Sequence, residues 1–261
     1  MSVKKLFDLS GRVAVVTGGS RGLGLQMAEA LGEMGARVVL TARKQDELDA
    51  AVAQLAKQKI DAAAWPCDIG KREAIAPVAE AILKKYGKVD ILVNNAGATW
   101  GAPAEDHPLE AWDKLVSVNL SGAFALTQII AKRSMIPARW GRIINIASIA
   151  GLSGAGADIQ FIAYGTSKGA VVNFTRTLAG EWGPMGITVN ALAPGFFPSK
   201  MTQGTLDHFG VDNLAARAPL RRIGDNDDLK GAALLFASAA GKHITGQILA
   251  VDGGVSAVHG G

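Results

Sequence analysis

The sequence predicts an α/β fold in which one doubly wound parallel sheet of about seven strands carries helices on both faces. Three observations support this fold class: short apolar runs rich in β-branched residues recur, helical patterns lie between them, and a glycine-rich turn follows the first run. Continuous apolar runs are typical of strands that are buried on both faces of a parallel sheet. No linker or shift in composition interrupts the chain, so we expect a single domain over residues 1–261.

The predicted strands follow one another at regular intervals. Six of them are clear apolar runs, and the segment DAAAWPCD is a weaker strand because alanine dominates it. In chain order the predicted strands are 12–18, 37–42, 61–68, 89–95, 142–148, 187–194 and 247–254. Strands joined through helices in this way are connected by right-handed crossovers.

Helical patterns fill the intervals. Leu48, Val52 and Leu55 stand at i, i+4 and i+7, and the apolar residues of 75–83 trace one stripe ahead of Gly87, where that helix is expected to end. Pro77 interrupts this second pattern and leaves the beginning of the helix undefined.

Composition narrows the class of protein. With 49% hydrophobic residues among 261, the chain can bury a sizeable core. Its net charge of +4 comes from 27 basic and 23 acidic residues that are scattered along the chain, so no nucleic acid is expected as a partner. No run approaches about 18 apolar residues, and the start MSVKKLFDLSGR does not make a signal peptide, so no membrane is expected.

Cysteine and histidine usage limits redox and metal chemistry. Cys67 is the only cysteine, so the chain can form neither an intrachain disulfide nor a cysteine-based metal site. This favours a reducing, cytoplasmic setting. The four histidines show no ligand spacing, and no metal is expected.

The glycine-rich turn VAVVTGGSRGLGLQMAEAL runs from the first strand into a helix through Gly18, Gly22 and Gly24. Glycine permits the tight turn and the approach of backbone N–H groups to a pyrophosphate, to which the helix N-terminus adds its positive dipole end. The spacing is T-G-x-x-x-G-x-G, not G-x-G-x-x-G. A plain strand-to-helix turn also uses glycine, but the position after the first buried strand predicts a dinucleotide site.

The end of the second strand bears on which dinucleotide binds. An acidic residue there would accept hydrogen bonds from the adenosine ribose, yet the sequence reads TARK, with Ala42 in that place and Arg43 directly after it. Arg21 can converge on the same region. Guanidinium groups suit a 2′-phosphate, which predicts NADP(H) over NAD(H). The alternative is that both arginines are solvated surface residues.

The segment IAYGTSKGAV places Tyr164 four positions before Lys168 on a predicted helix. Such a pair can be an ordinary surface contact. It can also be a catalytic pair in which the lysine lowers the pKa of the tyrosine. Lowering that pKa from about 10 to about 7 takes on the order of 4 kcal/mol. A lysine cation at about 4 Å supplies roughly that much at an effective dielectric constant near 20.

Six motifs together carry a resemblance. They are TGGSRGLG, NNAG (94–97), SVNLSG (117–122), NIAS (145–148), YGTSK (164–168) and APG (193–195). In order and spacing the chain resembles the short-chain dehydrogenase/reductase (SDR) family from about residue 10 to 254. It is similar to 3-oxoacyl-acyl-carrier-protein reductases, rhamnolipid-type ketoacyl reductases and gluconate 5-dehydrogenase-like members. The resemblance implies an NAD(P)-binding Rossmann domain that interconverts a carbonyl and a secondary alcohol.

The resemblance also implies four catalytic residues, Asn119, Ser148, Tyr164 and Lys168. Tyr164 would donate a proton to the alkoxide as a general acid, and Ser148 would hydrogen-bond the substrate oxygen where negative charge develops. Lys168 would also contact the nicotinamide ribose, and Asn119 would hold a water molecule in a proton relay.

Further cofactor contacts carry over by resemblance, with the adenine near Asp68 and Ile69 and the nicotinamide near Pro194, Gly195 and Phe197. Ser199 is the nearest hydroxyl where the family has a threonine that bonds the carboxamide; it could equally cap the following helix. The expected cofactor-binding residues are Thr17, Gly18, Ser20, Arg21, Gly22, Leu23, Gly24, Arg43, Asp68, Ile69, Asn95, Ala96, Gly97, Tyr164, Lys168, Pro194, Gly195, Phe197 and Ser199.

Substrate specificity is expected in three loops at the carboxyl ends of the strands, 97–108, 149–163 and 196–224. Trp100, Phe161 and Phe196, with Phe197, suggest an apolar wall and a partly hydrophobic carbonyl substrate such as a 3-oxoacyl thioester. They could instead be core or interface residues. An acyl-CoA, a free ketone or a sugar acid remains open as the substrate.

The resemblance also bears on binding partners, on assembly and on a function other than catalysis. Arg139 matches one basic residue by which the fatty-acid branch recognises acyl-carrier protein, but Gly180 stands where the second would be, which argues against that partner. The family resemblance implies a homotetramer formed through helices near 108–134 and 160–182. A dinucleotide-sensing regulator without catalysis is the opposing class, because fold alone does not establish function.

Overall fold

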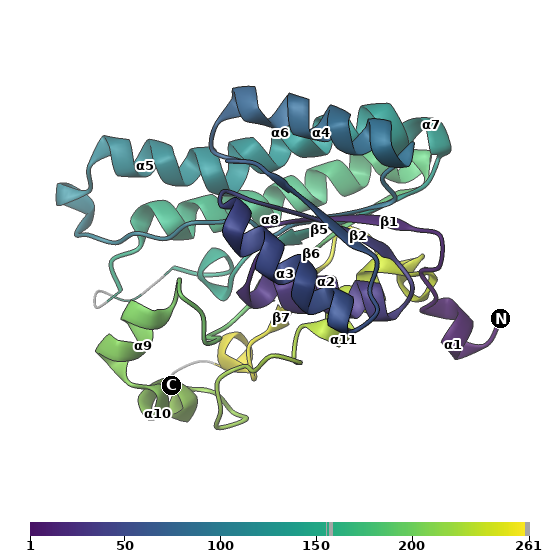
Figure 1. Ribbon diagram of the computed structural model, residues 1–261. Coiled ribbons are helices and arrows are strands. Elements are labelled where there is room, and N and C mark those ends of the chain that lie inside the picture. Colours follow the sequence, from purple (N-terminus) through teal and green to yellow (C-terminus); the bar gives the residue numbers. More distant parts are fainter. Residues whose placement is uncertain (155, 157–158, 259–261) are drawn as a thin grey trace.

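A seven-stranded parallel sheet forms the centre of the molecule, and its order is β3-β2-β1-β4-β5-β6-β7. The computed structural model describes residues 1–154, 156 and 159–258 (Figure 1). The strands are β1 Val13–Thr17, β2 Arg37–Ala42, β3 Ala62–Pro66, β4 Ile91–Asn94, β5 Gly141–Ile146, β6 Ile187–Pro194 and β7 Ile248–Val251. The predicted doubly wound fold and all seven predicted strands are therefore confirmed.

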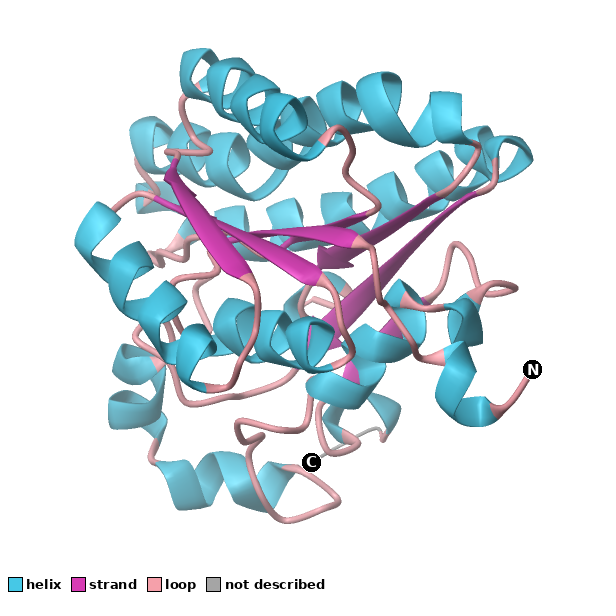
Figure 2. Cartoon of the chain, turned by 45° about the vertical axis from the view of Figure 1, so that its right-hand side comes forward, coloured by secondary structure: helices cyan, strands magenta, loops and turns pink. Residues whose placement is uncertain are grey.

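Helices cover both faces of the sheet, as Figure 2 shows. One layer contains α2, α3 and α11, and the opposite layer contains α4, α5, α6 and α8. Their bounds are α2 Gly22–Glu33, α3 Gln45–Lys57, α4 Arg72–Tyr86, α5 Leu109–Val116, α6 Gly122–Ile130, α8 Ile162–Trp182 and α11 Lys230–Ala237. A short helix, α1 Val3–Leu6, precedes the first strand.

The two cores explain why the strands read as unbroken apolar runs. In β1, Val13 and Val15 belong to the core beneath α4, α6 and α8, whereas Ala14 and Val16 belong to the core beneath α2, α3 and α11. Successive side chains of a strand point to opposite faces, so a strand covered on both faces needs apolar residues at every position.

Helix α4 begins earlier than its apolar pattern suggests. It runs from Arg72 to Tyr86, and Gly87 directly after it has a φ of 72°, the left-handed conformation expected of a glycine at a helix end. Pro77 lies inside this helix, on its exposed side. The interruption of the pattern by Pro77 therefore does not mark the beginning of the helix.

The chain is continuously helical from Leu109 to Ala138, through α5, α6 and α7 Ile136–Ala138. Two π-helical turns, Ser117–Ser121 and Ala131–Met135, interrupt its α-helical hydrogen bonding. By length and composition this helix could cross a membrane, but 44% of its most apolar window is buried within the fold. A helix that packs on a sheet passes the same test, so this observation is a weak argument for a membrane span.

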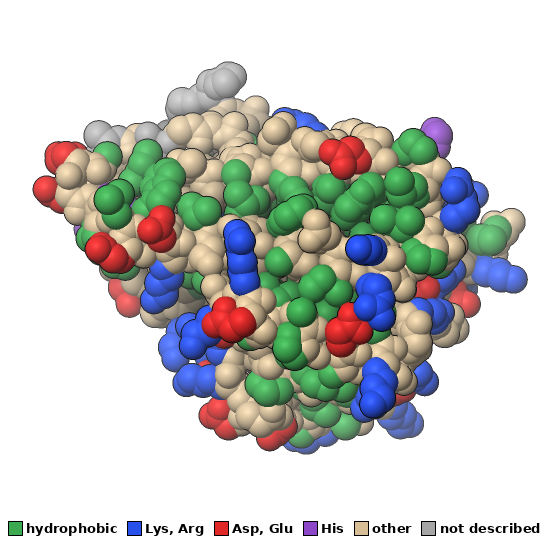
Figure 3. Space-filling model, turned by 90° about the horizontal axis from the view of Figure 1, so that it is seen from above, with side chains coloured by type: hydrophobic (Ala, Val, Ile, Leu, Met, Phe, Trp, Pro, Cys, Tyr) green, Lys and Arg blue, Asp and Glu red, His purple; other side chains and the backbone are tan. Residues whose placement is uncertain are grey.

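The helical layer of α4, α5, α6 and α8, uppermost in Figure 1, leaves apolar side chains at the surface. Figure 3 shows hydrophobic groups gathered in a band across this face. One exposed apolar side chain of this helical layer is Phe124 of α6, which is 43% exposed and meets the ring of Phe174 of α8 edge to face.

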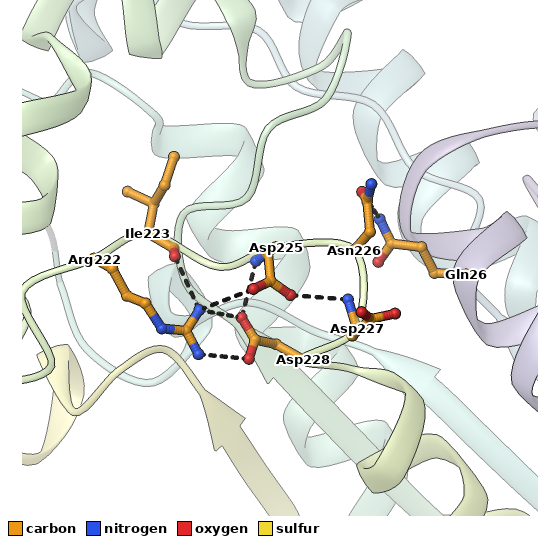
Figure 4. Close-up of polar contacts among 7 residues, drawn as sticks. All are labelled: Gln26, Arg222, Ile223, Asp225, Asn226, Asp227 and Asp228. Atoms are coloured by element: carbon orange, nitrogen blue, oxygen red, sulfur yellow. Dashed lines mark hydrogen bonds and ion pairs between the residues drawn. The ribbon is translucent and has the colours of Figure 1, made fainter.

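The segment after β6 folds over the carboxyl edge of the sheet through α9 Gln203–Phe209 and α10 Val211–Arg217. The loop from α10 to α11 is fastened by an ion pair between Arg222 Nη2 and Asp228 Oδ1 at 2.6 Å (Figure 4). Asn226 of this loop accepts a hydrogen bond from Gln26 of α2 at 2.9 Å. These contacts connect the C-terminal segment to the helix that follows the glycine-rich turn.

Candidate active site

The carboxyl ends of β1 and β4 lie side by side where the strand order reverses, and their backbones are bonded together there. Thr17 Oγ1 accepts hydrogen bonds from the N–H groups of Asn95 and Ala96, both at 3.0 Å. Asn95 Nδ2 donates in turn to the carbonyl oxygens of Thr17 at 2.9 Å and Gly18 at 3.1 Å. Such a reversal point is where open α/β sheets bind ligands.

The glycine-rich turn has the backbone that its sequence predicts. Gly18 and Gly22 have φ values of 63° and 55°, which favour glycine. A Cβ atom at Gly24 would collide with the carbonyl group of Gly18 and with Asn95 Nδ2. The turn therefore brings bare backbone and the N-terminus of α2 to the reversal point, which fits a pyrophosphate.

The two predicted phosphate-binding arginines are not alone. Arg21 Nη1 lies 2.7 Å from Glu47 Oε1, and Lys44 Nζ lies 3.4 Å from the same oxygen. Glu47 stands in the first turn of α3, so a carboxylate does occur in the region that TARK left without one. Arg43 is exposed and has no hydrogen bond or ion pair among the described residues. We call Arg21, Arg43, Lys44 and Glu47 the arginine cluster.

The next expected cofactor residues follow β3. Asp68 Oδ1 accepts a hydrogen bond from the Gly70 N–H at 3.1 Å, and Ile69 is buried. Ser20 Oγ donates to Glu47 Oε2 at 3.4 Å. Leu23 of α2 packs against the core beneath α2, α3 and α11. All of these residues lie on the carboxyl side of the sheet, as predicted from the connectivity.

Asn119 is 3% exposed and lies in the first π-helical turn of the long helix. Its Oδ1 accepts from the Ala98 N–H at 2.8 Å, while its Nδ2 donates to the Ala98 carbonyl at 3.0 Å and to Ser167 Oγ at 2.9 Å. Ser167 Oγ donates to the Tyr164 carbonyl at 2.8 Å. Asn119 thus connects the loop after β4 to α8, and π-helical turns are frequent at functional sites.

Ser148 and Tyr164 meet at the carboxyl end of β5. Ser148 is 8% exposed, and its Oγ accepts from the Ala150 N–H at 3.2 Å. Burial raises the pKa of the Tyr164 hydroxyl, and a hydrogen bond with Ser148 lowers it by a smaller amount. The protein's own groups therefore leave the Tyr164 pKa above its ordinary value, against the lowering expected from Lys168.

Lys168, the group expected to lower the Tyr164 pKa, is itself buried. It is 5% exposed, its Nζ donates to the Ile146 carbonyl at 2.7 Å, and burial lowers its pKa to about 8. Its Nζ lies 5.7 Å from the centre of the Tyr164 ring. A Cβ atom at Gly97 would lie 3.3 Å from Asn119 Oδ1 and 3.6 Å from Lys168 Nζ, so the loop after β4 closes on both groups.

Asn119, Ser148, Tyr164, Ser167 and Lys168 thus form one contiguous group, which we call the tyrosine cluster. The four predicted catalytic residues come from the long helix, the end of β5 and α8, and the fold brings them together. Sequence reasoning missed Ser167, although it stands directly before Lys168 in the YGTSK motif.

The residues after β6 are placed differently from one another. Gly195 packs tightly against Asp252, and Phe197 is 3% exposed with its ring in the core against Gly224. Phe197 also lines a second cavity, with Pro219, Leu220 and Val251, and its predicted place beside the nicotinamide stays a prediction. Ser199 Oγ accepts from the Thr202 N–H at 3.2 Å in the turn before α9, and its Cβ lies 3.9 Å from a Cβ built on Gly22. The N-cap residue of α9 is Thr202, so Ser199 does not cap this helix.

The three aromatic residues predicted to form an apolar wall are placed differently from one another. Phe161 meets the Tyr164 ring edge to face, with ring centres 6.1 Å apart, and lines a cavity beside it. Trp100 is 41% exposed and packs against His107 at 4.8 Å; neither Trp100 nor Phe196 is among the residues that line this cavity. Residues 155, 157 and 158 of the predicted loop 149–163 lie outside the described residues.

Comparison with known proteins agrees with this geometry. The family model for short chain dehydrogenases matches residues 12–208. The chain is 39% identical over 257 residues to gluconate 5-dehydrogenase of Gluconobacter oxydans, covering 98% of this chain and 99% of the relative. It is 37% identical over 252 residues to the rhamnolipids biosynthesis 3-oxoacyl-[acyl-carrier-protein] reductase of Pseudomonas aeruginosa, covering 95% and 97%.

Two further matches bear on the cofactor. A gluconate 5-dehydrogenase from Burkholderia cenocepacia, solved in complex with NADP and tartrate, has a TM-score of 0.93 at 33% identity and covers 98% of this chain and 100% of its own. An NAD-dependent glycerol dehydrogenase of Listeria innocua is 39% identical over 250 residues, with 96% of both chains covered.

Proposed function

The chain belongs to the short chain dehydrogenase family, and we propose that it is an NADP(H)-dependent oxidoreductase that interconverts a ketone and a secondary alcohol. The observation that carries this proposal is the tyrosine cluster. Its proton donor, hydrogen-bond donor and buried lysine lie at the carboxyl edge of the sheet, beside a glycine-rich turn that fits a pyrophosphate.

In the direction of reduction, NADPH, when bound, supplies the hydride that reaches the carbonyl carbon. Tyr164 donates its hydroxyl proton to the ketone oxygen, and Ser148 donates a hydrogen bond to the same oxygen while negative charge develops on it. Lys168 orients the nicotinamide ribose and stabilises the phenolate that remains on Tyr164. Asn119 holds the loop after β4 against α8, which fixes the distance between the cofactor cleft and Tyr164.

Cofactor binding is assigned to the expected residues around the cleft. The glycine-rich turn would hold the pyrophosphate, Asp68 and Ile69 the adenine, and the loop of Asn95, Ala96 and Gly97 the side near the nicotinamide. For a 2′-phosphate, the arginine cluster offers Arg21, Arg43 and Lys44, with Glu47 as a competing anion. The solved relative with bound NADP supports NADP(H), whereas the NAD-dependent relative makes a direct comparison of the two cofactors necessary.

For the substrate, we favour a 3-oxoacyl thioester or a similar ketone. The cavity lined by Phe161 and the 3-oxoacyl reductase among the relatives support this choice. A sugar acid is the second candidate, because gluconate 5-dehydrogenases are similar over nearly the whole chain. Acyl-carrier protein is a doubtful partner: Arg139 bonds the Pro184 carbonyl, and Gly180 offers no second cation.

A homotetramer is the assembly that we propose. The long helix 109–138 and α8 present the apolar band of Figure 3, which a second copy could cover. Light scattering coupled to size-exclusion chromatography would measure the mass of the assembly, and a monomer would contradict this part of the proposal.

Oxidation of NADPH and NADH against a panel of ketones, 3-oxoacyl thioesters and keto-sugar acids tests the proposed function. We expect turnover with at least one ketone and a higher kcat/KM for NADPH than for NADH. Tight NADPH binding without turnover of any substrate would favour the non-catalytic regulator. A clear preference for NADH would overturn the cofactor assignment.

A further inference from the structure

Four polar side chains form a hydrogen-bonded row between the sheet and the helices α6 and α8. We call them the amide ladder: Asn94, Thr127, Asn145 and Thr175. Asn94 Nδ2 donates to Asn145 Oδ1 at 2.8 Å and to Thr127 Oγ1 at 2.9 Å. Asn145 Nδ2 donates to Thr175 Oγ1 at 2.9 Å, and Thr175 donates its own proton to the Val171 carbonyl at 2.8 Å. The ladder therefore joins β4 and β5 to two helices.

All four members of the ladder are buried, and both threonines are fully buried. Buried polar groups must be hydrogen-bonded, so an apolar core would be the simpler way to hold a helix on a sheet. Apolar contacts are non-directional, however, whereas a hydrogen bond has a preferred length and direction. A buried hydrogen-bonded row therefore specifies one alignment of the strands and helices that it joins.

On β5 and α8 the ladder lies close to the reaction site. Asn145 begins the segment NIAS, which ends with Ser148, and the carbonyl of Ile146 in this segment accepts from Lys168 Nζ at 2.7 Å. Thr175 stands about two turns after Lys168 on α8. The strand and the helix are thus bonded at two levels, once through Lys168 and once through Thr175.

The same arrangement occurs on β4 and the long helix. Asn94 ends β4, and Ala98 in the loop after this strand exchanges two backbone hydrogen bonds with the Asn119 amide. Thr127 stands about two turns after Asn119 on the long helix. Each of these two strands is therefore bonded to the helix whose catalytic candidate meets the segment that follows the strand.

A displacement of α8 along the sheet would affect the predicted catalytic residues unequally. Tyr164 and Lys168 both belong to α8, so their spacing would stay the same. Ser148 belongs to the segment after β5, so its separation from Tyr164 would change. The alignment of α8 on β5 therefore decides whether Ser148 and Tyr164 can meet the same ketone oxygen.

Building on the proposed function, we propose that Asn145 and Thr175 are positioning residues for the reaction. Their hydrogen bond holds α8 at one height on β5 and so keeps the Tyr164 hydroxyl beside Ser148. Neither residue needs to touch the substrate or the cofactor, because both act through Ser148 and Tyr164. Small displacements matter in such a site, since a misplacement of about 1 Å can cost about a hundredfold in rate.

Thr175→Val tests this proposal, because valine has nearly the shape of threonine but lacks the hydroxyl oxygen. With NADPH and the ketone of the panel that is reduced fastest, we expect kcat to fall about tenfold. The affinity for NADPH, measured by fluorescence titration, should stay within about twofold, because the glycine-rich turn is untouched. Thr175→Ser keeps the hydroxyl and should restore kcat to within about twofold of the unmodified protein.

The pH profile distinguishes positioning from a general loss of stability. A hydrogen bond with Ser148 lowers the pKa of Tyr164, so an α8 that no longer holds the two together should raise that pKa. When NADP⁺ oxidises the secondary alcohol that corresponds to the same ketone, Tyr164 accepts a proton and must be ionised. The rising limb of kcat against pH should therefore move up by about half a pH unit in Thr175→Val. Thr175→Ser should return it.

Thr188→Val is the matched control. Thr188 of β6 is also a buried threonine, but its Oγ1 has no hydrogen-bond partner within the described residues. The substitution removes a buried hydroxyl without removing a bond of the ladder. It should leave kcat and the rising limb unchanged, and urea unfolding of both variants would show any loss of stability.

Two results would overturn the inference and leave the proposed function in place. One is an unchanged kcat and pH profile in folded Thr175→Val, and the other is an equal loss of kcat in Thr175→Val and Thr188→Val. If Thr175→Val does not fold, Thr175→Cys replaces it, since sulfur is a weak acceptor.

In Thr175→Cys we expect kcat to fall about threefold, because the bond to Asn145 is weakened and not lost. A kcat equal to that of Thr175→Ser would overturn the inference. Absence of turnover of the whole ketone panel by the unmodified protein would instead overturn the proposed function, and this inference with it.

Discussion

The tyrosine cluster and the arginine cluster stand along the same edge of the sheet but are built in opposite ways. In the tyrosine cluster, Lys168, Asn119 and Ser148 are 5%, 3% and 8% exposed and are bonded to backbone groups. In the arginine cluster, the side chains of Arg21 and Glu47 are 48% and 24% exposed and bond to each other.

This difference matches the chemistry that each cluster is proposed to perform. Proton transfer needs pKa values set by the protein, and burial is the largest influence on both Tyr164 and Lys168. Recognition of a phosphate needs only accessible cations, which solvent and salt screen. Substitutions in the two clusters should therefore differ in size and in their response to salt.

The largest effect is expected from Tyr164→Phe, which removes the proposed proton donor. We expect kcat to fall by about a thousandfold or more, because general acid catalysis contributes 10²–10⁴-fold. NADPH affinity, measured by fluorescence titration, should stay within about twofold, since the ring and its packing on Phe161 remain.

The chain offers a control for this substitution, because its only other tyrosine is Tyr86. Tyr86 lies at the end of α4 and packs against Trp65. Tyr86→Phe should leave kcat unchanged. Retained turnover in Tyr164→Phe would refute the assignment of the proton donor.

The second prediction concerns the pH dependence of stability. Burial lowers the pKa of Lys168 to about 8 from an ordinary value of 10.5, so between these values the unfolded chain binds more protons than the folded one. The free energy of unfolding should therefore rise with pH from about 8 toward 10.5, by at most about 3 kcal/mol at 1.4 kcal/mol per unit.

Urea unfolding of the protein and of Lys168→Met between pH 7 and about 9.5 measures this contribution. Below about pH 10 the raised pKa of Tyr164 adds little to the pH dependence of the unfolding free energy, so the change in this range reports on Lys168. The free energy of unfolding of the unmodified protein minus that of Lys168→Met should rise with pH. This rise should change little in salt, because the lysine is buried. A difference independent of pH would mean that Lys168 is not desolvated as described.

The strands and the tyrosine cluster could be predicted from the sequence, because each leaves a local pattern or motif in it. The seven strands follow from local runs, since burial on both faces leaves a signal at every residue. The four catalytic candidates were found through motifs, and the fold brings them together from separate elements.

Contacts between distant segments left no such signal. Glu47 meets Arg21 across 26 positions, and nothing in TARK or in the glycine-rich turn indicates that pair. Phe197 and Trp100 illustrate the same limit. Both are aromatic residues in predicted specificity loops, yet one is buried in the core and the other is 41% exposed against His107. Composition alone does not tell which way a loop side chain faces.

The smallest predicted effect comes from Glu47→Gln in the arginine cluster. Removing this carboxylate frees Arg21 and Lys44 to meet a 2′-phosphate, so the KM for NADPH should fall about two- to threefold, as expected for an exposed ion pair. The KM for NADH, which lacks that phosphate, should not change.

Asp46→Asn is the matched control for this substitution. Asp46 stands directly before Glu47 and makes no ion pair with Arg21 in the described structure. Removing its charge should therefore leave both KM values unchanged. About 0.5 M salt should erase the gain in Glu47→Gln, because screening acts on exposed charges. If NADPH and NADH responded equally to Glu47→Gln, the arginine cluster would not be the site of the 2′-phosphate, and its exposed construction would need another explanation.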